Sequence, residues 1–243
     1  MRNRNNGISS PDPNVRVSRR HLLGAVSAAG AMAFRKSTWG QELEIPQEPE
    51  IPQDPEQALL ALYKGNERFA SEKSVSRHRD LDRVRLVAPK QTPFAAFLGC
   101  ADSRVPIEIV FDQGFGDLFV TRIAGNVASS ENIGSLEFGS LVLGCKIIFV
   151  LGHSACGAVT AAMKGDEVPG QISGLFQHIR PAVKAAKGDL DKAIIENVKN
   201  QAMTIAESSP VISKLVQRRE LIVTGGIYDL TTGRVQPIDV RVS

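Results

Sequence analysis

The chain has 243 residues, of which 42% are hydrophobic and 23% are charged, so it is long enough and apolar enough to form a substantial folded core. Its formal charge of +3 is misleading, because five arginines and one aspartate lie before position 34 and leave 24 basic and 25 acidic residues in the rest of the chain. A nucleic-acid-binding protein is expected to carry a basic surface, so this balance argues against that class of function.

The first 40 residues have the pattern of an export signal. Arg19 and Arg20 precede an apolar stretch, from 22 to 34, that is shorter than the roughly 20 residues needed to span a bilayer. Ala31-Met32-Ala33 matches an A-x-A cleavage site. We therefore predict a twin-arginine signal over residues 1–40, cleaved after about residue 33, and a periplasmic location. Membrane contact is expected only through an uncleaved leader, and a disordered terminus with two chance arginines is the alternative.

Residues 41–54 form a predicted acidic linker, because prolines recur every third residue and favour an extended polyproline II conformation. A proline-motif ligand for a partner is the alternative. The folded domain is predicted over 55–243, beginning with a helix that Asp54 caps and Pro55 opens.

The remaining pattern alternates apolar strands with helices. After a polar region of loops or short helices over 71–90, strands are predicted over 94–99, 118–123, 146–151, 221–224, 227–230 and 235–240. Helices are predicted over 107–112, over 130–143 with Ser130 as cap and Gly144 as stop, over 157–164, and over 171–218 with breaks at Gly188 and Pro210. This order indicates an α/β fold with a mostly parallel β-sheet flanked by helices. In such sheets, ligand sites lie beyond the carboxyl ends of the strands, where Cys100 and His153 both fall.

Cys100, His153 and Cys156 form a soft ligand set of the kind that Zn²⁺ accepts. The two-residue gap between His153 and Cys156 lets one tight turn supply two ligands. The fourth position stays free for water, which distinguishes a catalytic from a structural zinc site. We therefore predict a zinc site at the carboxyl ends of the strands.

Asp102 and Arg104 lie beside the first ligand, two residues apart, and point the same way if this run is extended. A bidentate pair with Arg104 keeps Asp102 off the metal and lowers its pKa, so that Asp102 accepts a hydrogen bond from a zinc-bound hydroxide. Lysine cannot provide the same planar fork.

Cys-x-Asp-x-Arg followed by His-x-x-Cys resembles the β-class carbonic anhydrases, over roughly residues 55–240. Further motifs carry the resemblance: Gly65-Asn66-Glu67-Arg68-Phe69, Asp112-Gln113-Gly114, Arg122-Ile123-Ala124-Gly125-Asn126 and Gly152-His153-Ser154-Ala155-Cys156-Gly157. The resemblance implies zinc-dependent reversible hydration of CO₂ to bicarbonate and a proton through a zinc-bound hydroxide. It carries the zinc ligands over to Cys100, His153 and Cys156 and the catalytic dyad to Asp102 and Arg104.

The family has two active-site styles. In the open style a glutamine helps to hold the substrate, and Gln91 looks like that residue. Phe119 and Phe138 look like apolar neighbours in the same pocket, although some relatives have tyrosine in place of Phe138. In the closed, inactive style Asp102 becomes the fourth zinc ligand. Gln91 favours the open style, with water or an anion as fourth ligand.

Several alternatives stay open. The same scaffold resembles hydrolases of carbonyl sulfide or carbon disulfide, and it also occurs as an inactive binding or assembly module. Cys100, His153 and Cys156 are also compatible with a structural zinc site, although Cys145 fits a core position better than a fourth ligand. A Cys100–Cys156 disulfide is a further alternative, which would leave His153 without a role. His78 and His178 are candidate proton shuttles or merely packed side chains. The resemblance also implies a homodimer or higher homo-oligomer in which the helix beginning near Pro55 embraces the neighbour.

Overall fold

The computed structural model describes residues 51–240, so the predicted export signal and residues 41–50 of the predicted linker lie outside the described range. Within this range, five strands form one sheet: β1 (Ala95–Gly99), β2 (Leu118–Arg122), β3 (Ile147–His153), β4 (Ile222–Tyr228) and β5 (Val235–Ile238). The helices are α1 (Pro55–Ala70), α2 (Leu81–Val87), α3 (Ile107–Val110), α4 (Ser130–Glu137), α5 (Gly157–Lys164), α6 (Ile172–Ala186), α7 (Leu190–Ser208) and α8 (Pro210–Gln217). A 3₁₀ turn, η1 (Ala124–Asn126), and a π turn, η2 (Phe138–Val142), complete the described chain.

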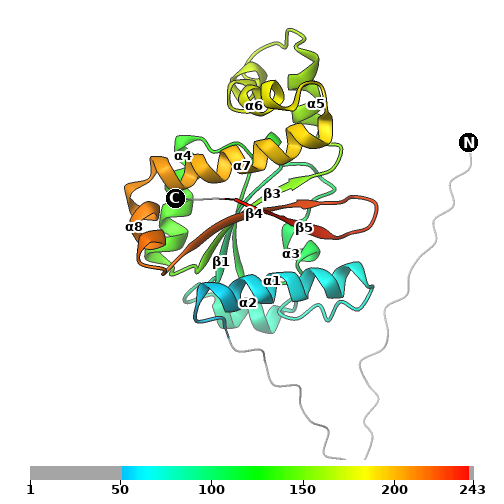
Figure 1. Ribbon diagram of the computed structural model, residues 1–243. Coiled ribbons are helices and arrows are strands. Elements are labelled where there is room, and N and C mark those ends of the chain that lie inside the picture. Colours follow the sequence, from blue (N-terminus) through cyan, green and yellow to red (C-terminus); the bar gives the residue numbers. More distant parts are fainter. Residues whose placement is uncertain (1–50, 241–243) are drawn as a thin grey trace, which may run out of the picture. The chain divides into compact units, whose positions relative to one another are not determined.

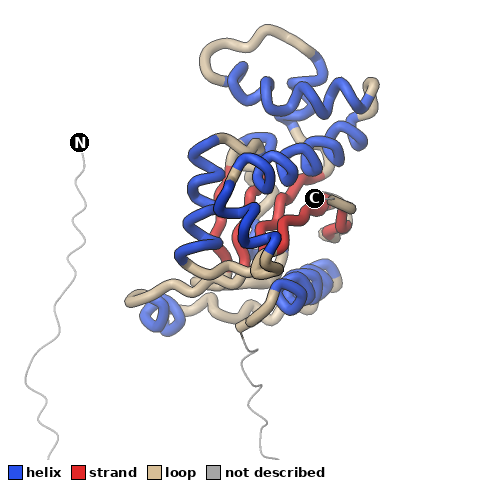
Figure 2. The backbone as a smooth tube through the Cα atoms, turned by 60° about the vertical axis from the view of Figure 1, so that its left-hand side comes forward, coloured by secondary structure: helices blue, strands red, loops and turns tan. Residues whose placement is uncertain are grey.

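The sheet has the strand order β2-β1-β3-β4-β5, with the first four strands parallel and β5 antiparallel to β4. All residues of β1 and β3 are buried, as expected for central parallel strands that are covered on both faces. Figures 1 and 2 show helices on both sides of the strands. The predicted α/β fold with a mostly parallel sheet is therefore confirmed.

Two apolar cores lie on opposite faces of the sheet because side chains alternate along each strand. Phe97 and Phe149 pack with α1 and α3 on one face, which lies toward the bottom of Figure 1. Leu98 and Val150 pack on the other face with α7, whose Val198 is completely buried. A third apolar cluster, formed mainly by α5 and α6, extends from these cores to the ends of β1 and β3 and includes Cys100 and Cys156.

The helix predictions agree closely with the structure. Asp54 caps α1 by accepting a hydrogen bond from the Gln57 N–H, with Pro55 in the first turn. The region 171–218 forms three helices, separated near Gly188 and Pro210. None of the helices in the described range is long and apolar enough to span a bilayer.

The predicted helix over 130–143 differs in two details. Its cap is Ser129 rather than Ser130, and the α-helix changes after Glu137 into the π turn η2. Gly144, with a φ of 80°, ends the segment as predicted.

The prediction of two late strands was wrong, since residues 222–228 form the single strand β4. Gly225 and Gly226, which separate the two predicted strands, lie inside this strand. A Cβ on Gly225 would lie 2.5 Å from Val198 Cγ1 and 2.9 Å from the Val150 carbonyl oxygen. The glycine is needed here because α7 packs closely against the sheet.

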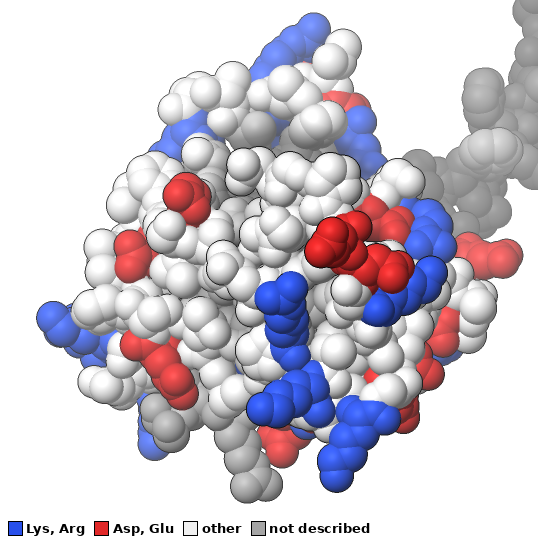
Figure 3. Space-filling view, turned by 90° about the horizontal axis from the view of Figure 1, so that it is seen from above, with Lys and Arg blue, Asp and Glu red and all other residues white. Residues whose placement is uncertain are grey.

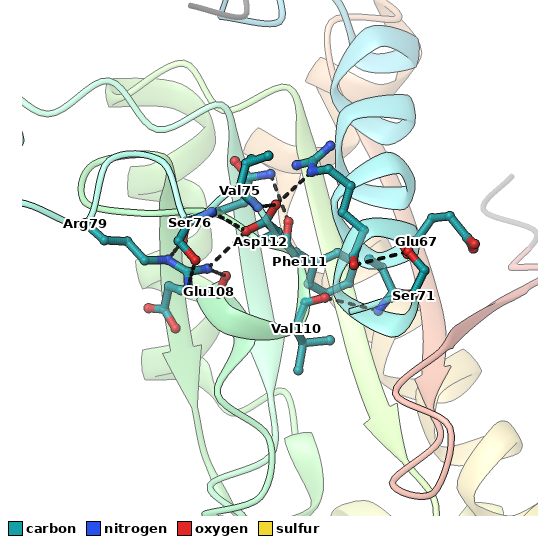
Figure 4. A network of polar contacts seen from close by, with 12 residues as sticks. Glu67, Ser71, Val75, Ser76, Arg79, Glu108, Val110, Phe111 and Asp112 are labelled. Atoms are coloured by element: carbon teal, nitrogen blue, oxygen red, sulfur yellow. Dashed lines mark hydrogen bonds and ion pairs between the residues drawn. The ribbon is translucent and has the colours of Figure 1, made fainter. Parts of the chain in front are cut away.

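Asp112 holds the loop that follows α1 against α3 (Figure 4). Its carboxylate accepts hydrogen bonds from Arg68 Nε at 2.7 Å, from the Val75 N–H at 3.1 Å and from the Ser76 N–H at 3.0 Å. Arg79 lies 3.5 Å away as a second cation. Burial opposes ionisation of this carboxyl, but the hydrogen bonds outweigh it and lower the pKa of Asp112.

Candidate metal centre

Cys100, His153 and Cys156 come together at the carboxyl edge of the sheet. Because β1 and β3 are adjacent and parallel, with Gly99 paired to Leu151, the residues that follow Gly99 and end β3 lie side by side. Cys156 is the N-cap residue of α5, one tight turn after His153. The Sγ atoms of the two cysteines and a ring nitrogen of His153 all lie within 4.8 Å of one another. All three side chains are buried, which favours one shared cation over three separate water-exposed groups.

The orientation of His153 leaves one ring nitrogen available to a ligand. Its Nδ1 lies 3.0 Å from the Ser154 carbonyl oxygen, so Nδ1 donates a hydrogen bond and Nε2 is left as the free acceptor. Nε2 is buried and has no hydrogen-bond partner among the described residues. A zinc ion would satisfy this nitrogen, and the backbone carbonyl would fix the tautomer that zinc requires.

The two thiols have opposite tendencies to ionise. The Cys156 thiol stabilises a thiolate at Cys100 and thereby lowers the pKa of Cys100, with the Gly125 N–H also donating to Cys100 Sγ at 3.4 Å. The pKa of Cys156 is raised by the neighbouring Cys100 and by burial. Together with a neutral imidazole, this pair forms the soft donor set that zinc prefers over harder cations.

Asp102 and Arg104 form a bidentate pair beside the cluster. Arg104 Nε donates to Asp102 Oδ1 at 2.9 Å and Arg104 Nη2 donates to Oδ2 at 2.7 Å. This pairing holds the pKa of Asp102 far below its usual range. Asp102 Oδ2 also lies 3.8 Å from His153 Nε2, so the carboxylate borders the space where a cation would sit.

The backbone that carries the pair is a turn, contrary to the extended run considered from the sequence. The Val105 N–H donates to the Asp102 carbonyl oxygen at 3.0 Å, and the Arg104 N–H donates to Asp102 Oδ1 at 2.9 Å. An aspartate side chain that bonds the backbone two residues ahead favours a turn. The turn therefore adds a third hydrogen bond that keeps the carboxylate away from the cation position.

Sequence reasoning assigned no role to Arg122, which stabilises the same turn from β2. Arg122 Nε donates to the Cys100 carbonyl oxygen at 2.8 Å, and Nη2 donates to the Asp102 carbonyl oxygen at 2.5 Å. Asn197 and Gln201 of α7 were also missed, although both contact the loop that contains Gly125. Arg122 and Gly125 stand in a motif, whereas the two α7 residues have no sequence signal beyond being polar on a buried helix face.

The three predicted pocket residues lie toward the other end of the sheet from the cluster. Phe119 is paired with Ala96, four positions before Cys100, which corresponds to about 13 Å along a strand. Phe119 and Phe138 contact each other, with ring centroids 6.3 Å apart, and the Phe138 side chain is exposed. Gln91 is exposed and precedes β1. Within one chain, these residues therefore do not line the space beside the cluster.

The two histidines considered as proton shuttles have other contacts. His78 Nδ1 lies 2.8 Å from Asp117 Oδ1, in the loop before α2. His178 lies on α6, and its carbonyl oxygen accepts a hydrogen bond from Gln201 Nε2 at 3.1 Å. The ion-pair contact supports a packing role for the His78 side chain, whereas the His178 contact involves only its backbone.

Comparisons with known proteins agree with this arrangement. The sequence profile of the carbonic anhydrase family matches residues 95–235. Carbonic anhydrase 2 of Mycobacterium tuberculosis is 36% identical over 182 residues, which cover 72% of this chain and 88% of the relative. The solved structure of the β-carbonic anhydrase of Coccomyxa in complex with acetazolamide is 29% identical, with a TM-score of 0.57, and the match covers 78% of this chain and 90% of that one. A structure described as one of two tetrameric β-carbonic anhydrases of Sordaria macrospora shares the fold, with a TM-score of 0.60 at 22% identity, covering 74% of this chain and 96% of that one.

Proposed function

The chain belongs to the β-class carbonic anhydrases, and from this premise we propose that it catalyses the reversible hydration of CO₂ to bicarbonate and a proton. The observation that carries this proposal is the buried Cys100–His153–Cys156 cluster with the Asp102–Arg104 pair at its border. A purely structural zinc site needs four protein ligands. Among the described residues the cluster has three, and Asp102 is held by Arg104.

The resident metal in this proposal is Zn²⁺, held by the two sulfur atoms and by His153 Nε2. When bound, zinc supplies Lewis acidity that lowers the pKa of a coordinated water from about 16 to about 7. The protein supplies the donors and the exclusion of bulk water, since the three ligand side chains are 4% exposed or less. The carbonyl oxygen of Ser154 holds the His153 ring in place throughout.

Asp102 acts in this proposal as an orienting acceptor. It stays ionised at neutral pH because Arg104 lowers its pKa, and an ionised carboxylate has lone pairs beyond those that Arg104 occupies. It can therefore accept a hydrogen bond from a water or hydroxyl in the space next to His153 Nε2 and aim a lone pair of that oxygen at CO₂. Arg104 keeps the carboxylate from becoming a ligand itself, which corresponds to the open style of the site. A structure at high pH with Asp102 on the metal and the Arg104 bonds broken would contradict this assignment.

The test of the activity is stopped-flow CO₂ hydration by zinc-loaded protein, with Cys100→Ser and Asp102→Asn as comparison variants. We expect turnover by the wild type, loss of zinc and of activity in Cys100→Ser, and retained zinc with reduced turnover in Asp102→Asn. The same preparations are assayed with carbonyl sulfide and carbon disulfide. Zinc-loaded protein that turns over only the sulfur compounds, or none of the three substrates, would overturn the proposal.

A homo-oligomer is part of the same proposal, with a homodimer as its smallest form. Phe119 and Phe138 lie on and beside β2, which is an edge strand, and Phe138, Leu141 and Val142 are exposed apolar side chains. If Gln91 and the two phenylalanines serve a substrate pocket, it must be that of a neighbouring copy, because they lie far from the cluster of their own chain. Sedimentation at micromolar concentration tests this assignment, and a purely monomeric active enzyme would rule it out.

Export remains a proposal that rests on the paired arginines and the short apolar stretch after them. In it, residues 41–54 form an extended stalk between the leader and the enzyme domain. Fractionation of cells that express the wild type and the Arg19→Lys/Arg20→Lys double variant tests it. We expect wild-type activity in the periplasm and variant activity inside the cell, and an equal distribution of the two would refute export by this route.

A further inference from the structure

Two side chains of α7 hold the loop that follows β2 at both of its ends. Asn197 is 1% exposed, and its Nδ2 donates to the Gly125 carbonyl oxygen at 2.9 Å. Gln201 is 3% exposed, and its Oε1 accepts from the Ala128 N–H at 2.8 Å. Gln201 Nε2 in turn donates to Asn197 Oδ1 at 3.0 Å, so the two residues form one buried network, which we call the α7 bracket.

The loop that the bracket holds contacts a predicted metal ligand. Gly125 uses its carbonyl oxygen to accept from Asn197 and its N–H to donate to Cys100 Sγ at 3.4 Å. Its φ of 74° belongs to the left-handed region, and a Cβ at this position would lie 2.7 Å from Ile179 Cδ1. The residue is therefore enclosed between α6, α7 and the cysteine, and the bond to Asn197 holds its carbonyl group in place.

A hydrogen bond to a thiolate withdraws charge from the sulfur and fixes its position, and partners of metal ligands commonly change metal affinity by about 10- to 100-fold. We propose that Asn197 and Gln201 are positioning residues that aim the Gly125 N–H at the Cys100 sulfur and thereby set the affinity and electronic character of the zinc site. This inference rests on the proposed function, because it assumes that Cys100 binds zinc.

A purely structural role for the bracket makes a different prediction. In that case the loss of the network lowers the stability of the fold but leaves the metal–sulfur bond unchanged. The two roles are separated by Asn197→Asp, which keeps the shape and the acceptor for Gln201 but places an oxygen opposite the Gly125 carbonyl. Asn200→Asp is the matched control, since it makes the same change one turn along α7 at a side chain that is only partly buried.

The experiment measures zinc affinity by competition with a chromophoric chelator and the thiolate-to-metal charge-transfer bands of the Co²⁺-substituted protein. For Asn197→Asp we expect about tenfold weaker zinc binding and charge-transfer bands at longer wavelength, because a sulfur without its N–H donor gives up electrons more readily. Asn200→Asp is expected to match the wild type in both zinc affinity and charge-transfer wavelength. Asn197→Leu is expected to show the same changes without an added charge.

The outcomes decide between a positioning role and a purely structural role for the α7 bracket. Folded Asn197→Asp and Asn197→Leu with wild-type zinc affinity and Co²⁺ spectrum would overturn the inference and leave the proposed function intact. If both variants fail to fold, Gln201→Glu, which keeps the acceptor for Ala128 and loses the donor to Asn197, is judged by the same two readouts. A wild-type protein that binds no zinc would instead refute the proposed function, and with it the premise of the inference.

Discussion

At the scale of single residues, the pair between Arg104 and Asp102 determines where the carboxylate points. Three hydrogen bonds hold that carboxylate, two from the guanidinium and one from the Arg104 N–H. The Arg104 side chain is 54% exposed, so its hydrogen bonds to Asp102, rather than burial, hold it in this orientation. Only a planar, forked donor satisfies both carboxylate oxygens at once.

We therefore expect Arg104→Lys to lower CO₂ hydration by about 10-fold or more, although the positive charge is kept. The freed Asp102 is expected to replace the exchangeable ligand of zinc, which X-ray absorption detects as a change in the oxygen shell. Arg85→Lys is the matched control, because Arg85 forms a solvent-exposed ion pair with Asp82 on α2. Wild-type turnover in Arg104→Lys would show that positive charge alone is sufficient.

At the scale of elements, Asp112 joins α1, α3 and the loop over 71–80 through a fully buried carboxylate. Asp112→Asn puts an amide group where N–H donors point, and we expect it to lower the free energy of unfolding by about 2 kcal/mol at pH 7. Asp82→Asn, an exposed change on α2, is expected to stay within about 0.5 kcal/mol of the wild type. Urea denaturation of both variants measures the two differences.

The same measurement has a pH dependence with a fixed sign. The pKa of Asp112 is lower in the folded protein than in the unfolded chain, where it is about 3.9. Its stabilising contribution is therefore complete above that value and is lost as pH falls through the folded pKa. The difference between the wild type and Asp112→Asn should shrink below about pH 4, and a difference that grows with acidification would contradict this account of the site.

The strand β4 shows how a close contact between elements constrains the sequence. A Cβ on Gly225 would overlap Val198 of α7, so Gly225→Ala is expected to cost about 1–3 kcal/mol of stability through overpacking. Gly174→Ala is the opposite case, since Gly174 lies inside α6 with open space around its Cα, and alanine there is expected to add up to about 1 kcal/mol. Thermal unfolding measures the change in unfolding temperature of each variant. Equal changes in the two variants would disprove the packing argument.

The bounds of β4 could not be predicted from local sequence patterns. Local patterns predicted the cap of α1, the apolar strands and the two ligand segments, because each depends on neighbouring residues. Gly225 and Gly226 fell between two predicted strands, because the close packing of α7 against Gly225 is not encoded locally. The α7 bracket was missed for the same reason, since Asn197 and Gln201 acquire their role only when α7 lies over the loop at Gly125.

At the scale of the whole molecule, both signs of charge occur across the face in Figure 3, as expected for a chain that is nearly neutral outside its predicted leader. The interior contains an unsatisfied polar group. His153 Nε2 is a buried nitrogen without a hydrogen-bond partner among the described residues, and two thiols lie beside it. Burying an unpaired polar group is unfavourable. The fold is therefore expected to depend on the cation that satisfies this group.

Removal of zinc should accordingly lower the unfolding temperature, since a ligand that binds only the folded state at 100 times its Kd adds about 2.7 kcal/mol. We expect this shift in the wild type on treatment with a strong chelator, and its reversal when zinc is restored. Cys145→Ser should respond like the wild type, because Cys145 is buried in a different core and bonds the Pro93 carbonyl oxygen. Cys156→Ser should unfold at a lower temperature with or without chelator. An unfolding temperature of the wild type that is indifferent to zinc would mean that these three side chains do not share a cation.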